Sequence, residues 1–209
     1  SSGEILALVT APSYDPNMLV GRKRSKNSVF LMDTENPDKP AYDRALLAQY
    51  APGSPFKIMN ALIGLQENVI NPNTSFSCNN GYRYGKRKNE FMGCHCGIVG
   101  SPIYLKSALA KSCNSYFSNT FKRIVEKNNK PSEGLNKWSK HVKSFGLGNY
   151  LGYDLPAGQK GRVPTGTFYD NRINYRWNAS SVISNAIGQG DIETTPIQLA
   201  NFTAAIANR

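Results

Sequence analysis

The chain has 209 residues, and its 25 Lys and Arg exceed its 14 Asp and Glu, which gives a formal net charge of +11 at neutral pH. With 40% hydrophobic and 19% charged residues it has the composition of one folded domain or most of one, which excludes a disordered chain. No window approaches the run of about 18 apolar residues that a membrane-spanning helix needs. The basic runs 22–24 and 86–88 lie among turn residues, without the aromatic platform or glycine loop of a nucleic-acid module, so we expect no nucleic-acid partner.

The first half of the chain predicts one short strand and one central helix. The apolar run 4–9 favours a strand, and the polar, proline-punctuated range 21–40 is typical of a loop or small insertion. Ser54 stands directly before a proline, which is the pairing expected for a helix cap and the first helical position. Apolar residues then recur at helical spacing up to about Gln66, in a stripe wide enough to predict a buried helix.

The second half of the chain is mainly helical by the same criteria, with few convincing strands. Residues 150–185 are loop-rich, and 187–190 favour a tight turn. Further helices are predicted over 103–110, from about 115 to the residues before 128, over 135–145 and from 195 onwards. This pattern indicates a layer of helices that lacks part of its sheet.

A Ser-x-x-Lys pattern begins at Ser54. Residues three apart lie on one face of a helix, so Lys57 would place its amine beside the Ser54 hydroxyl. A serine becomes a nucleophile only when a neighbouring base removes its proton, and the positive end of a helix favours the anion that forms. Ser54 as a plain helix cap is the alternative. The pattern occurs only once in the chain.

A second candidate motif, Ser112-Cys113-Asn114, falls at the predicted break between two helices, where side chains can point into a cleft. The same Ser-x-Asn spacing occurs at 25–27 and 77–79, so the position of the motif carries more weight than its letters. The alternative is that Asn114 or Ser115 merely caps the following helix.

Several short motifs follow one another in a characteristic order over nearly the whole chain: 3–9, 13–17, 52–57, 112–114, 188–190 and 195–200. Together they resemble the transpeptidase domain of class B penicillin-binding proteins, most closely the elongation type. The resemblance implies an α/β fold of the penicillin-binding protein and β-lactamase kind, with helices packed on a mainly antiparallel sheet. Residues 1–209 would form part of that domain.

The chemistry implied by this resemblance is that of a peptidoglycan D,D-transpeptidase. Ser54 would attack the carbonyl between the two terminal D-alanines of a stem peptide, with Lys57 as its base. Ser112 would relay a proton to the leaving D-alanine, and Asn114 would hold the substrate amide. β-Lactams, which mimic that amide, would acylate Ser54.

The same resemblance also implies a cellular setting. The protein would lie on the periplasmic side of the inner membrane, anchored by a transmembrane helix that precedes Ser1. A glycosyltransferase of the elongation machinery would be its partner, and no organic cofactor is implied.

One motif of the family is missing. No Lys-Thr-Gly or Lys-Ser-Gly occurs, and Thr165-Gly166 follows a proline and has no lysine before it. In the family this motif lies on a strand downstream of the last helix seen here, so we expect a partial domain that is weakly active or inactive alone. The alternatives are a β-lactam sensor or scaffold that acylates without turnover and, ranked last, a β-lactamase, because nothing resembles the deacylating glutamate loop.

The cysteines are Cys78, Cys94, Cys96 and Cys113. An even count first suggests disulfides, but Cys94 and Cys96 are too close in sequence to pair easily with one another. Four thiols that converge favour a structural zinc ion, and His95 is an alternative to one of them. Some elongation-type relatives are similar in carrying a structural metal bound by the middle residue of Ser-x-Asn, a position that Cys113 occupies here.

Overall fold

Helices make up most of the regular structure, as the sequence predicts. The computed structural model describes residues 3–155, 157–173 and 176–208. The α-helices are α1 (Arg24–Met32), α2 (Arg44–Leu47), α3 (Phe56–Gln66), α4 (Leu105–Ala110), α5 (Asn114–Val125), α6 (Pro131–Ser144), α7 (Gly166–Arg172) and α8 (Pro196–Ala207). Two 3-10 helices are η1 (Pro16–Leu19) and η2 (Ala179–Ile187). None of the helices in these ranges is long and apolar enough to cross a membrane.

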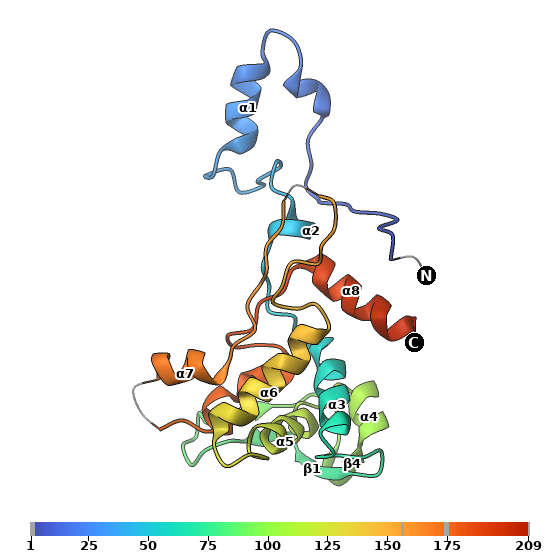
Figure 1. The fold of residues 1–209 in the computed structure, drawn as a ribbon, viewed down its shortest axis with the longest axis vertical. Helices are drawn as coiled ribbons and strands as arrows, with labels where there is room; N and C mark the ends of the chain where they lie inside the picture. Colours follow the sequence, from blue (N-terminus) through green and yellow to red (C-terminus); the bar gives the residue numbers. More distant parts are fainter. Residues whose placement is uncertain (1–2, 156, 174–175, 209) are drawn as a thin grey trace.

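The core of the main body lies where α3, α5 and α6 pack together (Figure 1). Trp138 of α6 is fully buried, and its ring meets Phe56 of α3 and Phe121 of α5 edge-on at centroid distances of 5.9 and 5.5 Å. Such aromatic pairs add to the stability that burial of their apolar area supplies. α3 is therefore the central buried helix that its apolar stripe predicts.

The strands form two small antiparallel pairs beside these helices. β1 (Ser75–Asn79) pairs with β4 (Val99–Tyr104), and β2 (Gly81–Arg83) pairs with β3 (Phe91–Gly93). The α/β architecture, with helices against antiparallel strands and a sheet that is incomplete, agrees with the predicted fold class.

A separate part of the chain projects from this body. Residues 15–42, with η1 and α1, extend away from it at the top of Figure 1. The sequence predicts a loop or small insertion here, and the insertion contains the helix α1. Only Leu31 of α1 is buried, whereas Val29, Phe30 and Met32 are exposed. The helix has little to pack against, so its apolar residues produce no helical stripe that faces a core.

Three sequence expectations on local structure are wrong. Residues 4–9 form no strand: the sheets of the described residues consist of β1 to β4, and Leu6 and Val9 remain 93% and 83% exposed. The helix predicted from 103 begins at Leu105, because the preceding residues pair with β1. The loop-rich range 150–185 contains α7 and most of η2.

The last helix and the glycine turn before it are confirmed. Thr195 and Gln198 form a reciprocal capping box at the start of α8, which satisfies backbone donors that a helix end leaves free. Gly188 and Gly190 have φ angles of +70° and +80°, in the left-handed region that glycine adopts readily. The turn over 187–190 therefore exists as predicted.

Candidate active site

The Ser-x-x-Lys pair lies at the entrance of α3. Lys57 occupies the first turn of this helix, and its Nζ is 3.2 Å from Ser54 Oγ. The Lys57 side chain is buried, with 2% of the residue exposed, whereas Ser54 is exposed. The Ser54 residue is thus accessible to solvent, while the Lys57 amine beside it is shielded.

The turn between α4 and α5 brings the second motif to the same point. Lys57 Nζ donates to Ser112 O at 2.7 Å, to Ser112 Oγ at 2.8 Å and to Asn114 Oδ1 at 2.5 Å. Ser112 Oγ in turn donates to Ser54 Oγ at 3.1 Å. Ser112 has a φ of +51°, an uncommon conformation for a residue with a side chain, and this bend directs both its oxygens at the amine. All four predicted catalytic residues therefore meet in one cluster.

Burial sets the electrostatics of the amine. It lowers the pKa of Lys57, while negative charge on the nearby thiols of Cys94 and Cys113 acts in the opposite direction. The net effect is a pKa below the ordinary value for lysine, so more of the amine is neutral at a given pH. A neutral amine beside a serine hydroxyl can accept its proton.

A glycine contact holds the turn that carries Ser54. The backbone N–H of Gly53 donates to Gly188 O at 2.8 Å. A Cβ at Gly188 would lie 2.3 Å from Gly53 O and 2.6 Å from the Phe56 Cβ, so no side chain fits there. The sequence analysis assigns no role in the site to this contact. The Gly-x-Gly spacing over 188–190 is the signal that points to it.

The four cysteines converge beside this cluster. All are buried and free, and their Sγ atoms lie within 4.8 Å of one another. The closest pairs are Cys78 with Cys96 at 3.5 Å and Cys94 with Cys113 at 3.7 Å, far beyond the disulfide bond length of about 2.05 Å. The alternative of two disulfides is not what the structure shows. His95 is exposed and does not belong to the cluster.

The geometry of this thiol cluster fits a tetrahedral metal ion. A Zn–S bond of about 2.3 Å implies S···S edges of about 3.8 Å, close to the separations of the two nearest pairs. Backbone N–H groups donate to two of these sulfurs: Asn114 N to Cys94 Sγ at 3.2 Å and Tyr116 N to Cys113 Sγ at 3.4 Å. Burial outweighs this bond at Cys113 and raises its pKa, and burial also raises the pKa of Cys78 to about 11. Burial acts to raise the pKa of Cys94, but hydrogen bonds from backbone N–H groups lower it to about 7.

The thiol cluster is connected directly to the catalytic cluster. Cys113 follows Ser112 in the turn, and Asn114 binds the Cys94 loop through its backbone N–H. The Asn114 side chain adds a second bond, from Nδ2 to Gly93 O at 2.7 Å. Whatever holds the four thiols together also orients Ser112 and Asn114.

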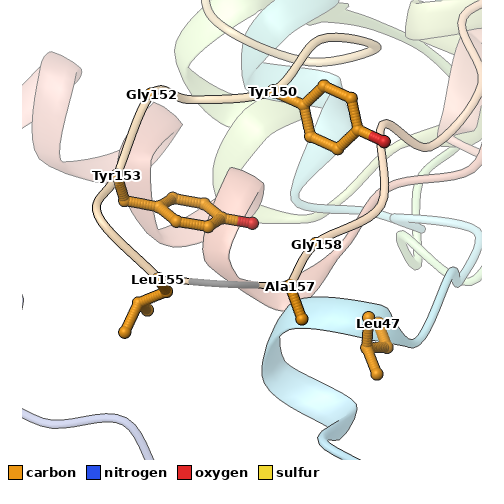
Figure 2. Close-up of a pocket in the computed structure, with 7 residues that line it drawn as sticks. All are labelled: Leu47, Tyr150, Gly152, Tyr153, Leu155, Ala157 and Gly158. Carbon is orange, nitrogen blue, oxygen red and sulfur yellow. The ribbon is translucent and has the colours of Figure 1, made fainter.

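The other sequence matches lie elsewhere. The Ser-x-Asn repeats at 25–27 and 77–79 fall in α1 and β1, and Thr165 caps α7 by accepting from Phe168 N at 3.1 Å. A separate pocket, shown in Figure 2, contains none of the predicted site residues. Its lining residues are Leu47, Tyr150, Gly152, Tyr153, Leu155, Ala157 and Gly158.

Comparison with known proteins identifies the family. Residues 1–209 match the family described as penicillin binding protein transpeptidase domain. The chain belongs to this family. It is 33% identical to the peptidoglycan D,D-transpeptidase MrdA of Acinetobacter baumannii over 211 residues, a match that covers 99% of this chain and 29% of that protein.

Solved structures of penicillin-binding proteins have the same fold. Pseudomonas aeruginosa PBP2 superposes with a TM-score of 0.82 at 29% identity, over 99% of this chain and 44% of that one. A chain from a peptidoglycan synthase complex that coordinates polymerization and crosslinking superposes with a TM-score of 0.81 at 28% identity, over 100% of this chain and 33% of that one. The penicillin-binding protein chain described here thus spans less than half the length of the relatives it matches.

Proposed function

We propose that this chain is part of a peptidoglycan D,D-transpeptidase in which Ser54 is the nucleophile. The observation that carries the proposal is the position of Lys57 Nζ, which is buried and within hydrogen-bond distance of both serine hydroxyls and of Asn114. The name of the MrdA relative and the family supply the reaction class. Residues 1–209 are one part of the transpeptidase domain, in keeping with their share of the relatives' length.

The first half-reaction forms an acyl-enzyme. Lys57, as the neutral amine, accepts the Ser54 proton while Oγ attacks the carbonyl between the two terminal D-alanines of a stem peptide. Ser112 lies between the two groups and carries a proton to the nitrogen of the departing D-alanine as the C–N bond breaks. Ser54 Oγ is left in an ester with the shortened peptide.

The second half-reaction reverses these roles. The amine of a neighbouring stem peptide attacks the ester, gives up a proton to Lys57 through Ser112, and forms the cross-linking amide as Ser54 Oγ leaves and is reprotonated. Asn114 orients the Lys57 amine in the structure. Its Oδ1 accepts a hydrogen bond from Lys57 Nζ, and its Nδ2 donates one to Gly93 O. Contact between Asn114 and the substrate amide requires an exchange of one of these partners.

The chain by itself is a weak catalyst in this proposal. It has no Lys-Thr-Gly sequence to supply a further oxyanion donor and to bind the substrate carboxylate. Loss of one oxyanion donor typically costs about 100- to 1,000-fold in rate. The full-length protein is therefore the form in which activity is expected.

Zinc is the metal proposed for the thiol cluster. Cys78, Cys94, Cys96 and Cys113 would hold it as four thiolates, with no place left for an activated water. The ion would supply structural cross-linking and no chemistry. It would join the loop that carries Cys94 and Cys96 to the Ser112 turn. No organic cofactor takes part.

The substrates and setting follow from the family. Stem peptides that end in D-Ala-D-Ala are the substrate, and β-lactams acylate the same serine. A solved relative belongs to a complex that couples polymerization to crosslinking, which supports a glycosyltransferase partner for this protein. Such a reaction takes place on the periplasmic side of the inner membrane, so a membrane anchor outside these residues is part of the proposal.

Labelling with a fluorescent penicillin tests the nucleophile. The full-length protein should acquire a stable covalent label, Ser54→Ala should not, and Ser101→Ala, an exposed serine of β4, should label like the wild type. Labelling of Ser54→Ala at the wild-type level would refute the assignment. A label that is lost rapidly by hydrolysis would identify a β-lactamase, and a stable label without cross-linking of peptidoglycan would identify a sensor or scaffold.

A further inference from the structure

The nucleophile turn depends on a contact from a distant part of the chain. No side chain caps α3, and the turn at Gly53 and Ser54 is instead held by the hydrogen bond from Gly53 N to Gly188 O. A Cβ at Gly188 would lie 2.3 Å from Gly53 O, so the two turns are in close contact on that side. The position of Ser54 relative to Lys57 therefore follows the position of the Gly188 turn.

Gly188 in turn follows the end of η2, an irregular helix whose last carbonyls need partners. η2 is interrupted at Val182, where φ is −123°, and its end is closed by the Gly188 N–H, which donates to Asn185 O and Ser184 O. Asn60 adds a donor from α3: its Nδ2 donates to Ala186 O at 2.8 Å and to Asn185 O at 3.3 Å. These carbonyls lie two and three residues before Gly188.

A third element fixes the orientation of this amide. Asn60 Oδ1 accepts from Trp138 Nε1 at 2.7 Å, and an indole N–H can only donate. The Asn60 oxygen must then face α6, and its amino group must face η2. Asn60 is fully buried, and it lies on α3 one helical turn after Lys57. A single side chain thus links the helix of the amine to the segment that supports the nucleophile turn.

We propose that Asn60 is a positioning residue for the acylation step. Its amino group holds the end of η2, and with it Gly188, at the distance from α3 that keeps Ser54 Oγ within reach of Lys57. Asn60 touches neither the substrate nor the reacting atoms. The inference rests on the proposed function, since it concerns the rate at which Ser54 is acylated.

Two variants separate the positioning role of Asn60 from simple core packing, one nearly isosteric at Asn60 and one that reduces the ring at Trp138. Asn60→Asp keeps an acceptor for Trp138 but places an oxygen against Ala186 O in place of the amino group. Trp138→Phe removes the indole donor but leaves the Asn60 amino group on η2, and it keeps an aromatic ring between Phe56 and Phe121. Each leaves buried polar groups unpaired, so both should lower the midpoint of thermal unfolding.

The measurement is the acylation rate constant of the full-length protein with a fluorescent penicillin, separated from the non-covalent dissociation constant by its concentration dependence. Asn60→Asp should lower the rate constant about 10- to 100-fold, because a displacement of about 1 Å at the reacting atoms costs on the order of 100-fold. The dissociation constant should change by less than about threefold. Trp138→Phe should leave the rate constant within about threefold of wild type.

Equal rate constants for the two variants, or a wild-type rate constant for Asn60→Asp, would overturn the proposal. If Asn60→Asp does not fold, Asn60→Leu combined with Trp138→Phe replaces it, because this pair buries no charge and leaves no unpaired indole. The double variant should be at least tenfold slower than Trp138→Phe alone, and equality would again overturn the inference. A wild-type protein that does not label at Ser54 would instead refute the proposed function.

Discussion

Replacement of Gly188 by alanine tests whether the glycine contact supports the active site. Two costs arise at this position. The left-handed backbone, with φ of +70°, costs a residue with a Cβ about 1–2 kcal/mol. The new Cβ would also lie 2.3 Å from Gly53 O, and overpacking of this kind typically costs about 1–3 kcal/mol. Gly188→Ala should therefore lower the free energy of unfolding by about 2–5 kcal/mol.

Gly152→Ala is the matched control. Gly152 has a φ of +73°, but no atom lies within 4 Å of the Cβ that alanine would add. It carries the backbone cost alone, about 1–2 kcal/mol. Denaturant unfolding of the two full-length variants gives the free energy of unfolding of each. The difference between the two values measures the cost of the close approach between the new Cβ at position 188 and Gly53 O.

The collision should also reduce activity, because its partner belongs to the Gly53–Ser54 turn. Penicillin labelling should be slowed at least tenfold in Gly188→Ala and remain near the wild-type rate in Gly152→Ala. If both variants lose equal stability and label equally fast, the close packing of Gly188 against Gly53 is not what holds the nucleophile.

Three further results are expected. Lys57→Ala should slow acylation of Ser54 about 100- to 10,000-fold. The wild-type labelling rate, measured over a pH series, should fall as the pH drops through the lowered pKa of Lys57, because the protonated amine cannot accept the Ser54 proton. Glu67 is buried, which acts to raise its pKa, but hydrogen bonds from Lys137, His141 and Lys127 lower the pKa to about 2. Glu67→Gln should therefore lower the free energy of unfolding by about 1–2 kcal/mol at pH 7, a value discounted because the partners are partly exposed. This difference from wild type should vanish as the pH falls from about 4.5 towards 2, because the wild-type carboxylate is then protonated. Glu126→Gln, in an exposed pair, should change stability little. Elemental analysis should find about one zinc ion per wild-type chain and a much lower zinc content in Cys78→Ser. A chelator should lower the midpoint of thermal unfolding of the wild type but not of this variant. A metal-free wild type would refute the zinc site.

The helices were predictable because their signals are local. The apolar stripe of α3, the spacing of aromatic residues in α5 and the Thr-Pro start of α8 each lie within one short segment, and all three helices form. The short strands were missed for the opposite reason. β1 and β4 owe their conformation to pairing with each other across the intervening residues 80–98, so neither segment carries the full signal.

The same distinction explains the wrong strand at 4–9. Its apolar residues favour a strand, but a strand is stabilised by pairing in a sheet, and the sheets of the described residues are formed by β1 to β4 without this segment. Strand propensity describes which residues fit into a strand, whereas pairing with another strand decides whether the strand forms.

The sequence by itself determined which residues are candidates for the site. The Ser54–Lys57 spacing requires only a helix to bring an amine beside a hydroxyl, and four cysteines with one partner in the Ser-x-Asn motif indicate a cluster before any coordinates are known. The first is a statement about neighbouring residues on one helix, and the second rests on residue chemistry together with the family resemblance.

Only the tertiary structure decided how these residues are held. The positive φ of Ser112 directs its oxygens at Lys57, Gly188 supports the nucleophile turn from 135 residues further along the chain, and Asn60 links three elements through one amide. Each depends on contacts between segments far apart in sequence. Such contacts have no local pattern, because their energies come from packing and hydrogen bonds that exist only once the chain has folded.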